Sequence, residues 1–108
     1  MAVPNSIKYM QILNNIGLSI GSAPILRRYK NINIDSINQS GFGYMNECTY
    51  GSENKPLNNG YIVTLIYDTD YVLQLYVYVK NSKQLCMRHK YNSNWSKWNL
   101  YQGTEVDL

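Results

Sequence analysis

The chain has 108 residues, which is enough for one domain and too few for two domains of ordinary size. Only 16% of the residues are charged and the net charge is +3, whereas nucleic-acid-binding domains usually carry a strongly basic surface. Tyrosine is abundant, with eleven residues against two tryptophans and one phenylalanine. Because tyrosine joins an apolar ring to a polar hydroxyl, this composition suits strand faces and interfaces within an assembly better than a free enzyme.

Residues 1–30 differ from the rest of the chain. Asn5 or Ser6 can cap a helix, and apolar residues then recur at a spacing close to 3.5 until Gly17. The apolar positions are Ile7, Met10, Leu13 and Ile16. Such a short helix needs a packing partner, either its own domain or other copies in a larger particle. We therefore assign residues 1–30 as an N-terminal anchor or oligomerisation segment, helical or extended, ahead of a β domain at residues 31–108.

The beginning of the chain does not have the charged and then apolar pattern of a signal peptide. No apolar run reaches the length of about 18 residues that a membrane-spanning helix needs. We therefore expect synthesis in a cytoplasm without export by that route, and no membrane partner.

In the middle of the chain, residues 31–60 predict strand fragments and loops, including a short strand or bend at residues 41–44. After the turn at residues 58–60, three further turn signals separate four alternating segments, which predicts an antiparallel meander. These segments are YIVTLIYD, YVLQLYVYVK, QLCMRHKY and WSKWNLY. In the second of them, residues 71–80, neither face is plainly polar, so we expect that strand to be covered on both sides. The predicted fold class is mostly β, a small antiparallel meander or knob.

Groups that could perform catalysis or bind a metal are scarce. His89 is the single histidine and lies in mid-strand, while Asp68 and Asp70 share a turn and are explained by turn chemistry. Neither Cys48 nor Cys86 belongs to a set of cysteine and histidine residues with the number and spacing of a zinc site; two buried thiols are favoured, and a disulfide stays open. We expect no enzyme activity, no cofactor and no metal.

Two tryptophans lie in the last predicted strand. Trp95 and Trp98 are three residues apart, so in a regular strand their side chains point to opposite faces and form no flat platform. We expect one ring to pack on the meander and the other to lie at an edge or a subunit interface. Only a bulge in the strand would bring both rings to one side.

Several short motifs occur in an order that resembles the pyocin-knob family of small β modules in phage tail fibres and related appendages. They are Asp35-Ser36-Ile37, Gly41-Phe42-Gly43-Tyr44, Asn54-Lys55-Pro56, Asn58-Asn59-Gly60-Tyr61, Leu73-Gln74-Leu75-Tyr76, Met87-Arg88 and Trp95-Ser96-Lys97-Trp98. The resemblance covers about residues 31–101. It implies a compact β domain in a trimeric virion fibre, without a catalytic residue.

By position, the resemblance carries over the family's glutamine, its strand arginine and its W-S-x-W ending. A guanidinium stacks on indole faces, and its donors can satisfy an amide and carbonyl oxygens nearby. We therefore predict a polar and aromatic structural brace of the last hairpin, formed by Gln74, Arg88, Trp95 and Trp98.

The predicted function is that of a non-enzymatic phage virion protein, a tail-fibre or head-fibre appendage made in the bacterial cytoplasm. We expect a homotrimer, held to other virion proteins through residues 1–30, whose knob meets a bacterial surface polysaccharide. Aromatic faces stack on sugar rings, and the candidate residues for this contact are Tyr50, Tyr76, Tyr78, Tyr91 and Trp95.

Two alternatives stay open. A monomeric carbohydrate-binding module working beside a catalytic domain would not need residues 1–30. A single-strand nucleic-acid binder would use basic and aromatic strands and bind with a steep salt dependence, but the modest charge disfavours it.

Overall fold

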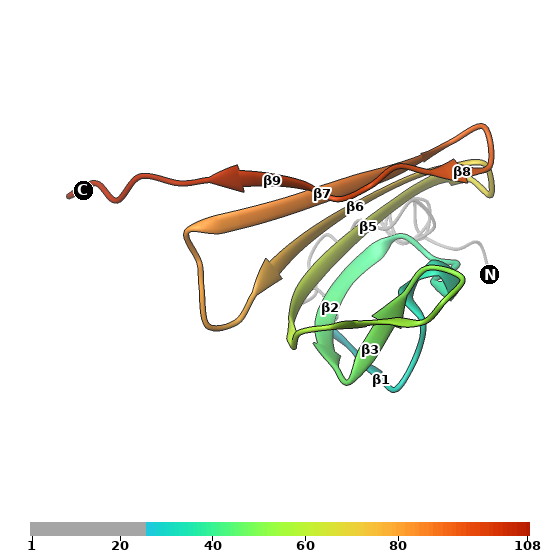
Figure 1. The fold of residues 1–108 in the computed structure, drawn as a ribbon, viewed down its shortest axis with the longest axis horizontal. Helices are drawn as coiled ribbons and strands as arrows, with labels where there is room; N and C mark the ends of the chain where they lie inside the picture. Colours follow the sequence, from blue (N-terminus) through green and yellow to red (C-terminus); the bar gives the residue numbers. More distant parts are fainter. Residues whose placement is uncertain (1–25) are drawn as a thin grey trace, which may run out of the picture.

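The structure is a computed structural model that describes residues 26–108 (Figure 1). The described part consists of β-strands, loops and one 3-10 turn, which confirms the prediction of a mostly β fold. The predicted helix at residues 7–16 and most of the predicted anchor segment lie outside the described residues.

Seven strands form one sheet, in which neighbouring strands follow the order β1-β2-β5-β6-β7, with β8 and β9 both paired to the free edge of β7. The strands are β1 (Leu26–Lys30), β2 (Gly41–Asn46), β5 (Gly60–Asp68), β6 (Tyr71–Tyr78), β7 (Gln84–Tyr91), β8 (Asn94–Trp95) and β9 (Asn99–Gln102). From β5 onward all pairs are antiparallel, as the alternating segments predicted.

The sheet is mixed, whereas the sequence predicted an antiparallel one. The last five residues of the predicted anchor segment form β1, which pairs in parallel with β2, from Leu26 opposite Phe42 to Lys30 opposite Asn46. A parallel neighbour needs a crossover connection, and here the crossover contains the 3-10 turn η1 (Ile34–Ser36). The sequence LRRYK did not predict this strand, because it is short and mostly basic. In the structure its residues alternate between exposed and half-buried.

A small second layer covers one face of the sheet, called the inner face below. It consists of η1 and the hairpin of β3 (Cys48–Tyr50) and β4 (Lys55–Leu57), in which β3 also contacts η1. The core lies between the two layers and consists of Ile34, Met45, Cys48, Ile62 and Tyr76. Gly60 allows the close packing of β5 on β6, since a Cβ there would lie 2.1 Å from the main-chain oxygen of Val77.

The opposite face of the sheet, called the outer face below, bears no charged side chain on β5, β6 and β7 apart from Asp68 at the end of β5. Its residues are Tyr61, Val63, Leu65, Tyr67, Tyr71, Leu73, Leu75, Val77, Leu85, Met87, His89 and Tyr91. Several of them are well exposed, among them Tyr61 at 50% and Leu65 at 51%. Within residues 26–108 only the inner face of β6 is covered, so the expectation of cover on both sides is not met by this part of the chain.

Candidate functional site

A bulge in the terminal strand decides where the two tryptophans lie. Trp95 pairs with Lys90 and Asn99 pairs with Met87, so residues 96–98 face only Arg88 and His89 on β7. The extra residue changes the alternation and brings both indoles to the inner face. Ser96 closes the bulge, because its Oγ accepts a hydrogen bond from the His89 amide (3.0 Å) and its own amide donates to the His89 carbonyl (2.8 Å). The prediction that the two rings point to opposite faces assumed a regular strand, and the bulge removes that condition.

The guanidinium of Arg88 lies among three aromatic rings. Its Cζ is 3.8 Å from the ring centroid of Trp95, 4.9 Å from that of Trp98 and 5.7 Å from that of Tyr50. Arg88 is only 2% exposed, so these cation–π contacts replace water as its surroundings. The rings come from β3 and the terminal strand, so Arg88 joins the hairpin layer to the edge of the sheet.

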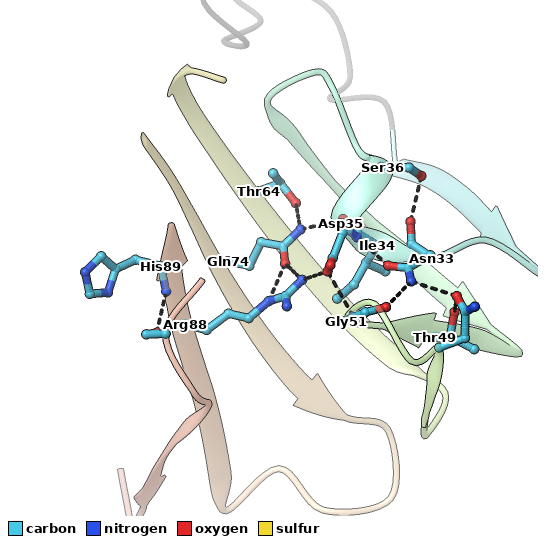
Figure 2. A network of polar contacts seen from close by, with 12 residues as sticks. Asn33, Ile34, Asp35, Ser36, Thr49, Gly51, Thr64, Gln74, Arg88 and His89 are labelled. Carbon is cyan, nitrogen blue, oxygen red and sulfur yellow. Dashed lines mark hydrogen bonds and ion pairs between the residues drawn. The ribbon is translucent and has the colours of Figure 1, made fainter. Parts of the chain in front are cut away.

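The polar side of the same guanidinium is bound by Gln74 and Asp35 (Figure 2). Arg88 Nε and one terminal nitrogen donate to Gln74 Oε1 at 2.9 and 2.7 Å, and that nitrogen also donates to Asp35 Oδ1 at 2.5 Å. The Gln74 amide then donates to the Ile34 carbonyl at 3.0 Å and to the Thr64 hydroxyl at 3.4 Å. The buried amide and guanidinium therefore have partners within the chain, as buried polar groups require.

Asp35 extends this network into the hairpin layer. Its Oδ1 also accepts from the Gly51 amide at 3.2 Å, and the Asn33 side chain donates to the Gly51 carbonyl at 2.7 Å and to Asn54 Oδ1 at 2.8 Å. In Figure 2 these side chains form one continuous path from β7 through β6 to the turn of the hairpin. The network thus connects the hairpin layer to the sheet by hydrogen bonds.

The positive charge of this cluster is buried. Burial lowers the pKa of the Arg88 guanidinium from its ordinary value, and the hydrogen bond and charge of Asp35 oppose that shift. Because an arginine stays protonated in proteins, Arg88 supplies a fixed buried charge. A buried guanidinium also cannot reach a phosphate of a nucleic acid.

The structure brings the four residues predicted as a brace, Gln74, Arg88, Trp95 and Trp98, into one cluster. Sequence reasoning missed the part of Asp35, although it noted the motif that contains it. Asp35 and Arg88 are 53 residues apart, and no local pattern connects them. That the cluster braces the last hairpin of the chain stays a prediction.

The candidate glycan-binding residues lie in different places. Tyr50 packs edge-on against Trp98, and Trp95 covers Arg88. Tyr76 is 6% exposed, packs on Trp98 and donates its hydroxyl to the Asn58 carbonyl at 2.9 Å, so no ring face is open to a sugar. Tyr78 is half-buried against the core. Tyr91 stands apart from all of these, 65% exposed at one end of the outer face.

Among residues 26–108, no group of three or more histidine, cysteine or acidic side chains lies close enough together to hold a metal ion. Cys48 and Cys86 are both free thiols, and burial raises the pKa of the Cys86 thiol. The same part of the chain contains no helix long and apolar enough to cross a membrane.

No protein-family model matches the chain. No curated protein matches it either. Among solved structures, the fold is similar to that of the P. aeruginosa R1 pyocin fibre, in a structure of its C-terminal residues, with a TM-score of 0.56 and 21% sequence identity. The match covers 75% of this chain and 23% of that chain, so this chain corresponds to less than a quarter of the fibre fragment. At this identity the similarity establishes the fold alone.

Proposed function

We propose that the chain is a non-enzymatic structural protein of a phage virion appendage, of tail-fibre or head-fibre type. Its β domain is a knob of the pyocin-knob type that assembles as a homotrimer and is exposed to the bacterial surface. The segment before β1 connects the knob to other virion proteins. The similarity of the fold to a pyocin fibre supports the appendage role.

The proposal of self-association rests on the largely uncharged outer face of the sheet. Soluble monomers rarely expose a contiguous apolar surface of more than a few hundred square ångströms, and larger ones mark interaction sites. Leu75 lies at the centre of this face, between Val63 on β5 and Met87 on β7. In a trimer, neighbouring copies cover the central part of this surface around Leu75 and remove it from water, while the end of the face at the turns stays open.

The test is the solution mass of the full-length chain, measured by size exclusion with light scattering, for the wild type and for Leu75→Glu. We expect three chain masses for the wild type and one for the variant, because a carboxylate in the buried centre of an interface lacks a partner. The variant should keep its β-sheet circular dichroism, since Leu75 points away from the inner core.

The matched control is Leu100→Glu. Leu100 is 55% exposed and pairs with Cys86, so it lies on the inner side of the sheet edge. This control should leave the trimer intact. A wild-type monomer would contradict the trimer and favour the alternative of a monomeric carbohydrate-binding module. A trimer that survives Leu75→Glu would contradict the outer face as its interface.

A further inference from the structure

Three exposed tyrosines form a row at the end of the outer face where β5, β6 and β7 meet their turns. The centroids of Tyr67 and Tyr71 are 6.3 Å apart and those of Tyr71 and Tyr91 are 5.7 Å apart, and both pairs meet edge to face. Tyr67 is 88% exposed and Tyr91 65%. Of this row, called the tyrosine tip below, the sequence singled out only Tyr91.

Tyr67 lies at a bulge in β5. Ile66 pairs with Val72 and Asp68 pairs with Tyr71, which leaves Tyr67 as the unpaired extra residue of β5. Bulges of this kind occur next to functional sites, where they redirect a side chain. Here the bulge leaves Tyr67 without a partner on β6, and its side chain is 88% exposed.

The two turns beneath the tip are fastened together. The Ser93 hydroxyl and amide donate to the carboxylate and the carbonyl of Asp70, so the β7–β8 turn is held against the β5–β6 turn. Asn92 and Ser93 have φ values of 51° and 71°, a left-handed conformation that non-glycine residues seldom adopt. This clasp keeps Tyr91 beside Tyr71 before any ligand arrives, which lowers the entropy cost of binding.

The tip borders a shallow hollow of about 520 Å³, a size within the usual range for small-ligand sites. The residues around it include Ser40, Leu65, Tyr67, Tyr71, Leu73 and Tyr91. An apolar floor, three rings that each carry a hydroxyl group and a polar rim match a pyranose, which presents C–H faces for stacking and hydroxyl groups for hydrogen bonds.

We propose that the tyrosine tip is a binding site for a pyranose ring of a bacterial surface polysaccharide. The proposal rests on the appendage function above, because a knob exposed on a virion meets such glycans first. It moves the contact from the Arg88 cluster, where the aromatic faces serve packing, to the end of the outer face. Of the candidates derived from the sequence, Tyr91 alone belongs to this site.

The test measures binding of the full-length chain to an array of bacterial capsular, O-antigen and cell-wall polysaccharides. Tyr67→Ala should weaken binding by about tenfold, which corresponds to about 1.4 kcal/mol. Tyr67→Phe keeps the stacking ring and should bind within about twofold of the wild type. Tyr101→Ala removes a tyrosine that is 48% exposed on β9, outside the tip, and should bind like the wild type.

The solution mass of each variant is measured on the same samples. A wild type that binds no polysaccharide on the array, or a Tyr67→Ala variant that binds as the wild type does, would overturn the site. If Tyr67→Ala changes the mass, the tip is a contact between copies and the proposal is also wrong. A monomer that binds glycan through Tyr67 would instead contradict the trimer and leave the site standing.

Discussion

Replacing Asp35 by Asn tests how much the buried Arg88 depends on its counter-charge. The substitution keeps the size of the side chain and an oxygen that can accept the Gly51 amide, but removes the negative charge 2.5 Å from the guanidinium. Leaving one charge of a buried pair without its partner usually costs about 3–5 kcal/mol. We therefore expect Asp35→Asn to destabilise the fold markedly.

Several contacts in the structure should keep the loss of stability caused by Asp35→Asn below the upper end of that range. The Asp35 side chain is 27% exposed, so water compensates part of the change, and Gln74 keeps two hydrogen bonds to the guanidinium. The indole of Trp95 at 3.8 Å continues to stabilise the cation. We expect a loss of about 2–3 kcal/mol in the free energy of unfolding. For a domain of this size the loss lowers Tm by roughly 10–20 °C.

The assay is urea unfolding followed by tryptophan fluorescence, because both indoles lie against the guanidinium. Asp107→Asn makes the same charge change in the exposed C-terminal tail and should shift stability by less than about 0.5 kcal/mol. In an Arg88→Met background, Asp35→Asn should cost little, since no buried charge then needs a partner. A loss below about 0.5 kcal/mol, or equal losses in both backgrounds, would refute the ion pair as the cause.

Two further predictions concern the packing around β5 and β6. Gly60→Ala should prevent or severely weaken folding, measured by thermal unfolding, because the new Cβ would lie 2.1 Å from the Val77 carbonyl oxygen. Gly51→Ala is the control, because its new Cβ meets no atom within 4 Å and the only strain comes from the φ of +79°. It should lower the free energy of unfolding by about 1–2 kcal/mol. If Gly60→Ala and Gly51→Ala lose the same stability, the packing argument is wrong. Burial raises the pKa of Tyr76 from 10.0 to about 12, so its protonated form is favoured by folding, and this stability is present below pH 10 and lost as the pH rises toward 12. Between pH 9 and 12, the free energy of unfolding of Tyr76→Phe should therefore fall by about 2–3 kcal/mol less than that of the wild type, as measured by urea unfolding at each pH. If the two free energies fall in parallel with pH, Tyr76 is not responsible for the change.

Local patterns predicted the part of the fold that depends on neighbours in the chain. The alternation of apolar residues and the turn signals give β5, β6 and β7, and the predicted segment QLCMRHKY coincides with β7. The parallel strand β1 could not be found this way, because its partner is β2 across a crossover, and a strand of five residues with three basic ones has no strong pattern. Pairing between distant segments is a property of the folded chain.

The same limit applies to the site. Gln74 and Arg88 lie opposite each other in the register of β6 and β7, so a correct meander already places them together. Asp35 and the bulge at Ser96 depend on the second layer and on one extra residue in the terminal strand, and neither leaves a period in the sequence. The tyrosine tip was missed for a similar reason. In the sequence Tyr67 looks like an ordinary strand residue, and nothing in the pattern indicates the bulge that leaves it unpaired.

The two faces of the sheet show different solutions to the same problem of burial. On the inner face the chain supplies its own cover, and the polar groups of Gln74 and Arg88 are paired within it. On the outer face the described residues of β5, β6 and β7 present leucine, valine and tyrosine, with no charge except that of Asp68 at the end of β5. An ion pair at a buried position is weak evidence for added stability, but it can select one arrangement of packed layers. A domain that fixes one face with a specific polar cluster and leaves the other face largely uncharged is therefore suited to assembly through that second face.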